Sequence, residues 1–236
     1  MQTHSIKGRP DSALLTLGLL LGIIFLLGCL VASIALGVAD IGPGAVYQAL
    51  IAPDGSTEHV IIRSVRIPRS LTALLVGSAI AVAGAIMQGL TRNPLAEPGI
   101  LGINSGAAFA VVLSVFWFNT SSLSLYAVFA LIGAAVAAIT VYSLGSLGRG
   151  GLTPLNLTIA GAALTALVSS LTTAMLILSQ RTLEEIRFWL AGSVAGRDMD
   201  LIVQVLPYLA VGLCLGLAMG KQLTTLSLGE ETAQGL

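Results

Sequence analysis

Three arginines recur at intervals of three residues just before an apolar stretch: Arg63, Arg66 and Arg69. At this spacing their guanidinium groups could form one basic cluster at the membrane surface. Such a cluster could bind an acidic partner surface, or its long side chains could anchor a helix at a membrane interface. Spacing alone leaves both interpretations open. Pro68 lies inside the cluster and predicts that a helix starts near it, because proline is favoured in the first turn.

The second candidate is the segment 92–102, which reads Arg-Asn-Pro-Leu-Ala-Glu-Pro-Gly-Ile-Leu-Gly. Two prolines and two glycines in eleven residues exclude a regular helix here. Irregular backbone at membrane depth persists only where protein buries it or water reaches it. The segment is therefore either a tight turn between two helices or an element that lines a transport pathway.

The residue patterns of catalysis and metal binding are absent from the sequence. Gly220-Lys221 is followed by Gln222, so no phosphate-binding loop of the Walker A type is present. Cys29 and Cys214 both lie in apolar runs, without metal-ligand spacing. The formal net charge of zero does not favour a nucleic-acid partner. We expect no catalytic residue, no metal site, no cofactor and no nucleic-acid partner.

Composition indicates what surrounds these segments. Hydrophobic residues make up 56% of the 236-residue chain and charged residues only 9%, whereas soluble domains carry about 25% charged residues. A membrane-spanning helix needs about 20 apolar residues. The charge-free stretches predict an all-α, polytopic transmembrane helical bundle of about six spans: Ser12–Ala39, Leu71–Leu90, Ile100–Phe118, Leu125–Leu147, Leu155–Leu178 and Leu201–Met219. The first apolar run is longer than the core of a signal peptide, so we expect a permanent helix.

The distribution of basic residues only partly orients the chain. Lys7 and Arg9 before the first span favour a cytoplasmic N-terminus. The cytoplasmic side would then carry five basic residues and the opposite side six, so the positive-inside rule does not decide the orientation. The five are Lys7, Arg9, Arg92, Arg149 and Lys221, and the six are Arg63, Arg66, Arg69, Arg181, Arg187 and Arg197. The excess of outer arginines requires a separate explanation.

Three shorter helices are expected outside the spans. One is an amphipathic helix around Val46 to Ile51, and another is a surface helix over Thr182–Leu190 with Phe188 and Trp189 at the membrane interface. Ser227-Leu-Gly-Glu230 fits a capping box and predicts a short helix over residues 228–234.

Several motifs together resemble the FecCD family of ABC permeases, the membrane subunits of importers for ferric siderophores, haem and vitamin B12. These motifs cover nearly the whole chain. They are Arg66-Ile-Pro-Arg69, Gly84-Ala-Ile-Met-Gln-Gly89, Asn93-Pro-Leu-Ala-Glu-Pro-Gly99, Leu101-Gly-Ile-Asn-Ser-Gly106, Phe188-Trp-Leu-Ala-Gly-Ser193 and Leu226-Ser-Leu-Gly-Glu-Glu-Thr-Ala-Gln-Gly235. The resemblance implies a multi-pass protein of the cytoplasmic (inner) membrane with a cytoplasmic N-terminus. Its expected partners are cytoplasmic ATP-binding-cassette ATPase subunits, an extracytoplasmic substrate-binding protein and a second permease subunit, homo- or heterodimeric.

The resemblance also implies roles for single residues. Arg66 and Arg69 would dock the binding protein, and Asn93 and Leu95 would contribute to a cytoplasmic gate. Residues 1–236 would form one permease domain, with an ATPase-coupling element starting at residue 221. The coupling residues would be Leu228, Gly229, Glu230 and Glu231. Family members usually have about ten spans, so the six predicted here would be the N-terminal part of that fold.

Other functions fit a bundle of apolar helices. A secondary carrier driven by an ion gradient is one alternative, although no charged residue at mid-span suggests a proton relay. A membrane scaffold that transports nothing is another. Within the family, a ferric siderophore is the expected substrate, and haem and vitamin B12 remain open because the sequence has no ligand signature.

Overall fold

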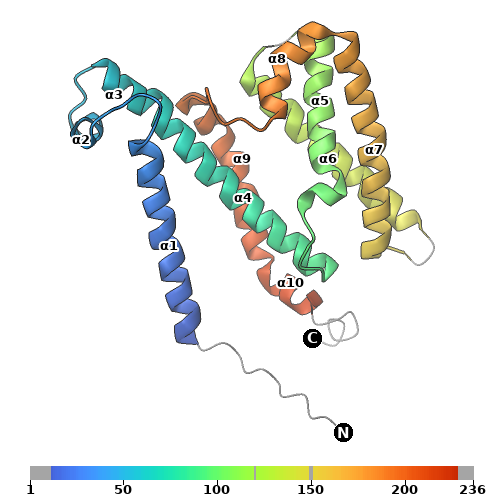
Figure 1. The fold of residues 1–236 in the computed structure, drawn as a ribbon. Coiled ribbons are helices and arrows are strands. Elements are labelled where there is room, and N and C mark those ends of the chain that lie inside the picture. Colours follow the sequence, from blue (N-terminus) through green and yellow to red (C-terminus); the bar gives the residue numbers. More distant parts are fainter. Residues whose placement is uncertain (1–11, 120, 149–150, 228–236) are drawn as a thin grey trace. The chain divides into compact units, whose positions relative to one another are not determined.

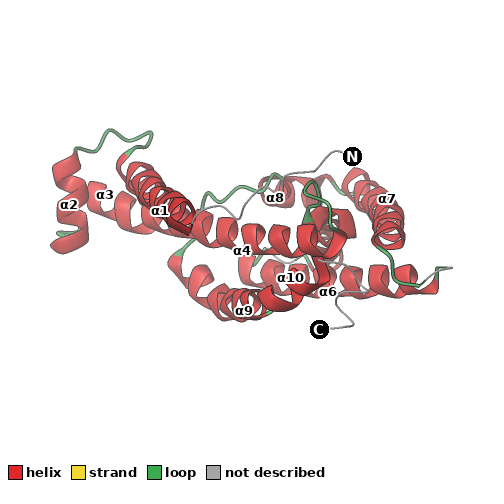
Figure 2. Ribbon diagram, turned by 90° about the horizontal axis from the view of Figure 1, so that it is seen from below, coloured by secondary structure: helices red, strands yellow, loops and turns green. Residues whose placement is uncertain are grey.

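The computed structural model describes residues 12–119, 121–148 and 151–227. Within these ranges every regular element is a helix and no strand occurs, which confirms the all-α class (Figure 2). The chain divides into two compact units, Met1–Leu74 and Leu75–Leu236, whose boundary falls inside one continuous helix, α4 (Ile67–Thr91).

The first unit begins with the long apolar helix α1 (Ser12–Ala35), followed by α2 (Pro43–Ile51) and α3 (Thr57–Ile61) (Figure 1). A π-helical turn, η1 (Ile62–Arg66), leads directly into α4. The core of this unit consists of apolar side chains from α2, η1 and the linker after α1, which are Ile41, Ala49 and Ile62. It holds the short helices against the last turn of α1.

The start of α4 agrees with the prediction from Pro68, but the helical run begins earlier. Thr57 to Thr91 is one apolar run of 35 residues because η1 joins α3 to α4. At this junction the Ile67 N–H donates to the Ile62 carbonyl, one residue further back than in an α-helix. Proline cannot donate to the helix ladder, so the wider turn directly before Pro68 accommodates it without ending the helix.

The described residues of the second unit form a 3₁₀ turn and six helices in addition to most of α4. They are η2 (Pro98–Leu101), α5 (Ile103–Phe118), α6 (Leu123–Leu147), α7 (Pro154–Leu178), α8 (Gln180–Leu190), α9 (Met199–Ala218) and α10 (Gly220–Ser227). Helix α5 packs against α6 and α7, and α8 contacts α5 and α7 (Figure 1). The main core cluster combines Val111, Val112 and Val115 of α5 with Tyr126 and Ile186. The surface helix predicted over Thr182–Leu190 is confirmed as α8.

Two glycines bring α5 and α6 into contact. A Cβ atom on Gly106 would lie 2.5 Å from the Ala137 Cβ, and one on Gly133 would lie only 2.3 Å from the Gly106 carbonyl oxygen. No side chain fits at either position. Small residues at such contacts let backbones approach and gain van der Waals packing, which is the main attraction between helices in lipid.

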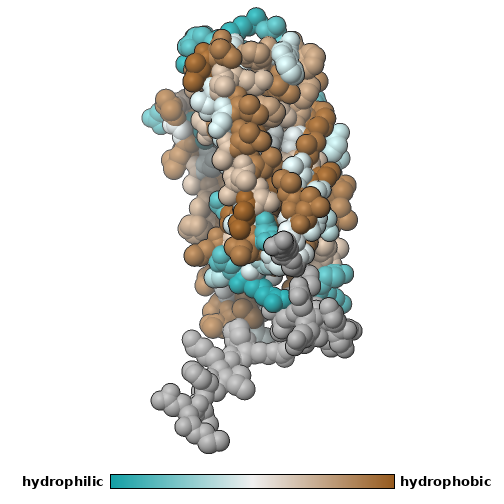
Figure 3. Space-filling view, turned by 90° about the vertical axis from the view of Figure 1, so that its right-hand side faces the viewer, coloured by the Kyte–Doolittle hydropathy of each residue, from teal (hydrophilic) through white to brown (hydrophobic). Residues whose placement is uncertain are grey.

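Among the described residues, five helical runs are long and apolar enough to cross a membrane: Ser12–Ala35, Thr57–Thr91, Leu123–Leu147, Pro154–Leu178 and Met199–Ala218. An α-helix occupies most of each of the six predicted spans, but α5 has only 16 residues. At 1.5 Å per residue it is about 24 Å long, shorter than the ~30 Å hydrocarbon layer. The predicted third span started at Ile100, which instead lies in η2. On the face that carries α7, hydrophobic side chains prevail in the middle and hydrophilic ones gather towards the ends (Figure 3).

Two predicted helix boundaries differ from the structure. The first span was expected to reach Ala39, but α1 ends at Ala35. Ser227 was expected to cap the start of a helix, which requires an extended backbone. That prediction is wrong, because α10 begins at Gly220 and includes Ser227. The helix predicted over residues 228–234 lies outside the described residues.

Candidate functional site

Arg66 lies at the end of α1 and binds its last carbonyl groups. The final carbonyls of a helix have no partner within the helix. Nη1 of Arg66 donates to the carbonyl oxygens of Ile34 and Ala35, at 3.0 and 2.7 Å, and Nη2 donates to the carbonyl of Ala39. The Arg66 side chain of η1 thus pairs the last carbonyl groups of α1 and also binds the linker between α1 and α2.

Arg69 extends this polar contact by about one turn. Its Nη2 donates to the Ser33 carbonyl at 3.2 Å, and the Ser33 and Ser70 hydroxyls lie 2.7 Å apart in a hydrogen bond. A cation at the C-terminal end of a helix is also favoured by the helix dipole. We call Arg66, Arg69, Ser33 and Ser70 the α1 clamp.

The expected surface position of Arg66 is wrong. Its exposed fraction is only 3%, whereas Arg69 is half-buried and Arg63 is exposed. The three arginines therefore do not form one exposed cluster, because the free carbonyls of α1 draw Arg66 inward. Gly37 makes room for it, since a Cβ atom there would lie 2.9 Å from the guanidinium. This contact accounts for part of the arginine excess that the sequence left unexplained.

The segment between α4 and α5 contains no α-helix, as predicted. Arg92 adopts a left-handed backbone with φ of 51°, which ends α4. The Leu95 N–H donates to Oδ1 of Asn93 at 2.9 Å, and the Ala96 N–H donates to the Asn93 carbonyl at 3.1 Å. Both bonds fold the segment into a tight turn around Pro94. The turn leaves the Leu95 side chain 85% exposed.

The other end of this segment rests on α7. A Cβ atom on Gly161 would lie 2.1 Å from the Ile100 carbonyl oxygen, so only glycine allows η2 to approach so closely. Gly102 has a left-handed backbone with φ of 68°, which turns the chain from η2 into α5. It lies beside the Thr165 hydroxyl of α7. We call residues 92–102 together with Gly161 the α4–α5 turn. Sequence reasoning missed Gly161, and the run of small residues around it is the only signal that could have indicated it.

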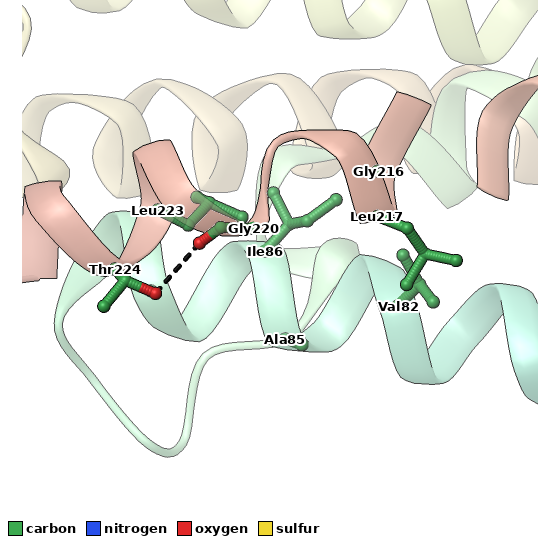
Figure 4. Close-up of a pocket in the computed structure, with 9 residues that line it drawn as sticks. Val82, Ala85, Ile86, Gly216, Leu217, Gly220, Leu223 and Thr224 are labelled. Atoms are coloured by element: carbon green, nitrogen blue, oxygen red, sulfur yellow. Dashed lines mark hydrogen bonds between the residues drawn. The ribbon is translucent and has the colours of Figure 1, made fainter. Parts of the chain in front are cut away.

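A groove of about 330 Å³ lies between α4 and the pair α9 and α10 (Figure 4). It is lined by Val82, Ala85, Ile86, Gly89, Gly216, Leu217, Gly220, Leu223 and Thr224. Its one side-chain polar group, the Thr224 hydroxyl, donates to the Gly220 carbonyl at 2.9 Å. No titratable side chain lines the groove, and no cluster of metal-ligating residues occurs among the described residues. Its chemistry fits helix packing rather than ligand binding.

The four predicted coupling residues, Leu228, Gly229, Glu230 and Glu231, lie outside the described residues. Of the other predicted site residues, the structure brings Arg66 and Arg69 together in the α1 clamp, and Asn93 and Leu95 together in the α4–α5 turn. The two pairs lie at opposite ends of α4.

Comparison with known proteins gives a consistent result. The model of the FecCD transport family matches residues 18–236. The chain is 45% identical over 214 residues to YfiZ of Bacillus subtilis, described as a probable siderophore transport system permease protein. It is 40% identical over 205 residues to the ferric enterobactin transport system permease protein FepD of Escherichia coli. It also resembles a solved inward-facing transporter assigned to the metal-chelate type of ABC transporters, with 31% identity and a TM-score of 0.71.

These matches cover most of this chain but only part of its relatives. The alignments include 91% of the chain and 64% of YfiZ, 86% and 61% for FepD, and 92% and 67% for the solved structure.

Proposed function

Because this chain belongs to the FecCD transport family, we propose that it is a membrane-spanning permease subunit of an ATP-binding-cassette importer that moves a ferric siderophore or a related metal chelate. The observation that carries this proposal is the family match over residues 18–236, supported by relatives named as permease proteins of siderophore and ferric enterobactin transport systems. The chain is a multi-pass membrane protein, and the part that the structure describes contains five apolar helices of spanning length. We place it in the cytoplasmic (inner) membrane with its N-terminus on the cytoplasmic side.

In this function, other subunits would hydrolyse ATP and capture the substrate. ATP hydrolysis would occur in separate cytoplasmic ATPase subunits, and substrate capture in an extracytoplasmic binding protein. A second permease subunit would complete the pathway.

Co-isolation tests the proposal. Affinity capture of the tagged chain from detergent-solubilised membranes of its own cells should bring down an ATP-binding-cassette ATPase in a stoichiometric ratio. A tagged unrelated multi-pass protein from the same membranes serves as the control. Capture of the chain without any ATPase would contradict the proposal and favour the ion-gradient carrier or the scaffold.

We propose different contributions for the two arginines implied in docking. Arg69 is half-buried, so part of its guanidinium can face an acidic surface of the binding protein. Arg66 is buried, and its guanidinium binds backbone carbonyls, so it would act by positioning Arg69 and α2. Charge reversal of Arg69 should weaken docking most at low salt, because exposed charges are screened by ions.

We propose that Asn93 and Leu95 form part of the cytoplasmic gate. The support is a turn fixed by two hydrogen bonds that directs an 85% exposed leucine away from the chain. Removing both side chains should let substrate leak without ATP. Leu228, Gly229, Glu230 and Glu231 remain the proposed contact with the ATPase, and a cysteine at Glu231 should crosslink to that subunit.

A further inference from the structure

Helix α2 carries apolar side chains on two opposite faces. The inner face packs into the core of the first unit through the buried Ala49 and the half-buried Ala45 and Val46. The outer face carries Tyr47, Leu50 and Ile51, which share one side of the helix at spacings of three and four residues. Their exposed fractions are 65%, 55% and 64%.

This outer face is unusual for a helix in contact with water. A surface helix normally turns charged and polar residues outward, but none of the nine residues of α2 is charged and Gln48 is its one fully polar side chain. A contiguous exposed apolar face indicates a protein, ligand or membrane partner.

The orientation of α2 relative to α1 indicates that its partner is the membrane. Figure 1 shows α1 along its length and α2 nearly end-on, whereas Figure 2 looks along α1 and shows α2 from the side. The two views agree that α2 runs crosswise to α1, within the same compact unit. Because α1 crosses the membrane, a helix crosswise to it lies along the membrane plane.

The level of α2 along α1 also fits the membrane surface. Its inner face shares a core cluster with Ile34, which lies in the last turn of α1. With 24 residues, α1 is about 36 Å long and exceeds the ~30 Å hydrocarbon layer. Its last turn therefore reaches the zone between acyl chains and headgroups, and the clamp contact of Arg66 with the Ala39 carbonyl fixes the linker to α2 there.

We propose that α2 is an interfacial membrane anchor whose Tyr47, Leu50 and Ile51 insert among lipid acyl chains and headgroups. Lipid is the occupant that the surroundings favour, because the exposed apolar surface of α1 continues towards α2 through the exposed side chains of Leu36 and Val38. Tyrosine is enriched at this depth, since its ring is apolar and its hydroxyl is polar. This anchoring surface is independent of what the protein transports.

Depth-dependent quenching of a single tryptophan tests the proposal. Trp117 and Trp189 are the two tryptophans of the chain and would be replaced by phenylalanine. Leu50→Trp, or Ile51→Trp if the first variant does not fold, is then reconstituted in phosphatidylcholine vesicles with brominated acyl chains. Glu58→Trp serves as the matched control on the exposed side of α3.

We expect bromine to quench Leu50→Trp at least about twofold more strongly than Glu58→Trp, and aqueous iodide to show the opposite order. Iodide quenching of Leu50→Trp equal to that of the control would show that the face is open to water. Protection from both quenchers would show that protein covers it. Either of these two results would overturn the proposal.

Discussion

Irregular backbone lies next to each end of α4, and different interactions hold it in place at the two ends. At its N-terminal end, the α1 clamp satisfies carbonyl groups with charged side chains that reach across 32 residues of sequence. At its C-terminal end, the α4–α5 turn depends on an Asn93 side chain and on the absence of a side chain at Gly161. The first end is held by charge-assisted hydrogen bonds and the second by close backbone packing, so they should respond to different mutations.

The largest effect is expected at the clamp. Arg66→Met removes the donors to three carbonyls while keeping a long apolar side chain. These acceptors are part-buried, and an acceptor left without a partner away from water costs about 1–3 kcal/mol, so we expect a total loss of about 3 kcal/mol in the free energy of unfolding. Thermal unfolding in detergent measures it.

Arg63→Met is the matched control, because the Arg63 side chain is exposed. Its effect should stay within about 0.5 kcal/mol. Equal destabilisation by the two variants would show that Arg66 is not a clamp residue. Arg66→Lys should recover only part of the stability, since an ammonium group cannot reproduce the planar fork of donors.

A smaller effect is expected at the α4–α5 turn. Gly161→Ala places a Cβ atom 2.1 Å from the Ile100 carbonyl oxygen, so η2 must move away from α7. Overpacking of this kind costs about 1–3 kcal/mol. A cysteine at the buried Ala96 should also react faster with a maleimide in this variant, after Cys29 and Cys214 are replaced by serine.

Gly84→Ala is the control for Gly161→Ala. Nothing lies within 4 Å of a Cβ atom at Gly84, so this variant should be neutral or stabilised by up to about 1 kcal/mol. If Gly161→Ala behaves like Gly84→Ala in both stability and labelling, the close contact between η2 and α7 does not hold the turn.

Tyr126→Phe removes a hydrogen bond between α6 and α8 and gives a reference for the effects at the two ends of α4. The Tyr126 hydroxyl donates to Oε1 of Glu185 at 3.3 Å and links α6 to α8. Its loss should cost about 0.5–1.5 kcal/mol, less than the loss of the clamp. A larger loss than for Arg66→Met would reverse the proposed order of these contacts.

The smallest effect concerns the loop before α3. The Ser56 backbone N–H donates to Oδ1 of Asp54 at 2.9 Å, and this bond lowers the pKa of Asp54 from its ordinary value of 3.8. A carboxylate with a lowered folded pKa stabilises the fold fully above the unfolded pKa and loses this effect as pH falls through the folded pKa. Asp54→Asn should therefore destabilise at about pH 6 and converge with the parent near about pH 3. A constant difference at both pH values would exclude the carboxylate as the cause.

Much of the fold follows from local sequence. Charge-free stretches predicted five spanning helices to within a few residues, and the polar segment with Phe188 and Trp189 predicted α8, because apolar length and residue pattern are local properties. The length of α5 was overestimated, because the apolar residues Ile100 and Leu101 belong to a 3₁₀ turn that is separated from the helix by Gly102.

The site residues were less predictable, because their environments depend on distant segments. Spacing placed Arg66 in a surface cluster, and only the position of the α1 carbonyls shows why it is buried. Gly161 is one of 27 glycines, so its type alone could not single it out. The irregular segment 92–102 was correctly predicted because prolines and glycines determine it locally.

Uptake of radiolabelled iron as a ferric siderophore tests the central claim most directly. Cells that express the transporter should accumulate the label, and cells with an in-frame deletion of this chain should not. We predict that uptake stops when ATP is depleted and continues when a protonophore collapses the ion gradient while ATP is maintained. Uptake that survives ATP depletion but collapses with the gradient would contradict the assignment as a permease subunit of an ATP-driven importer.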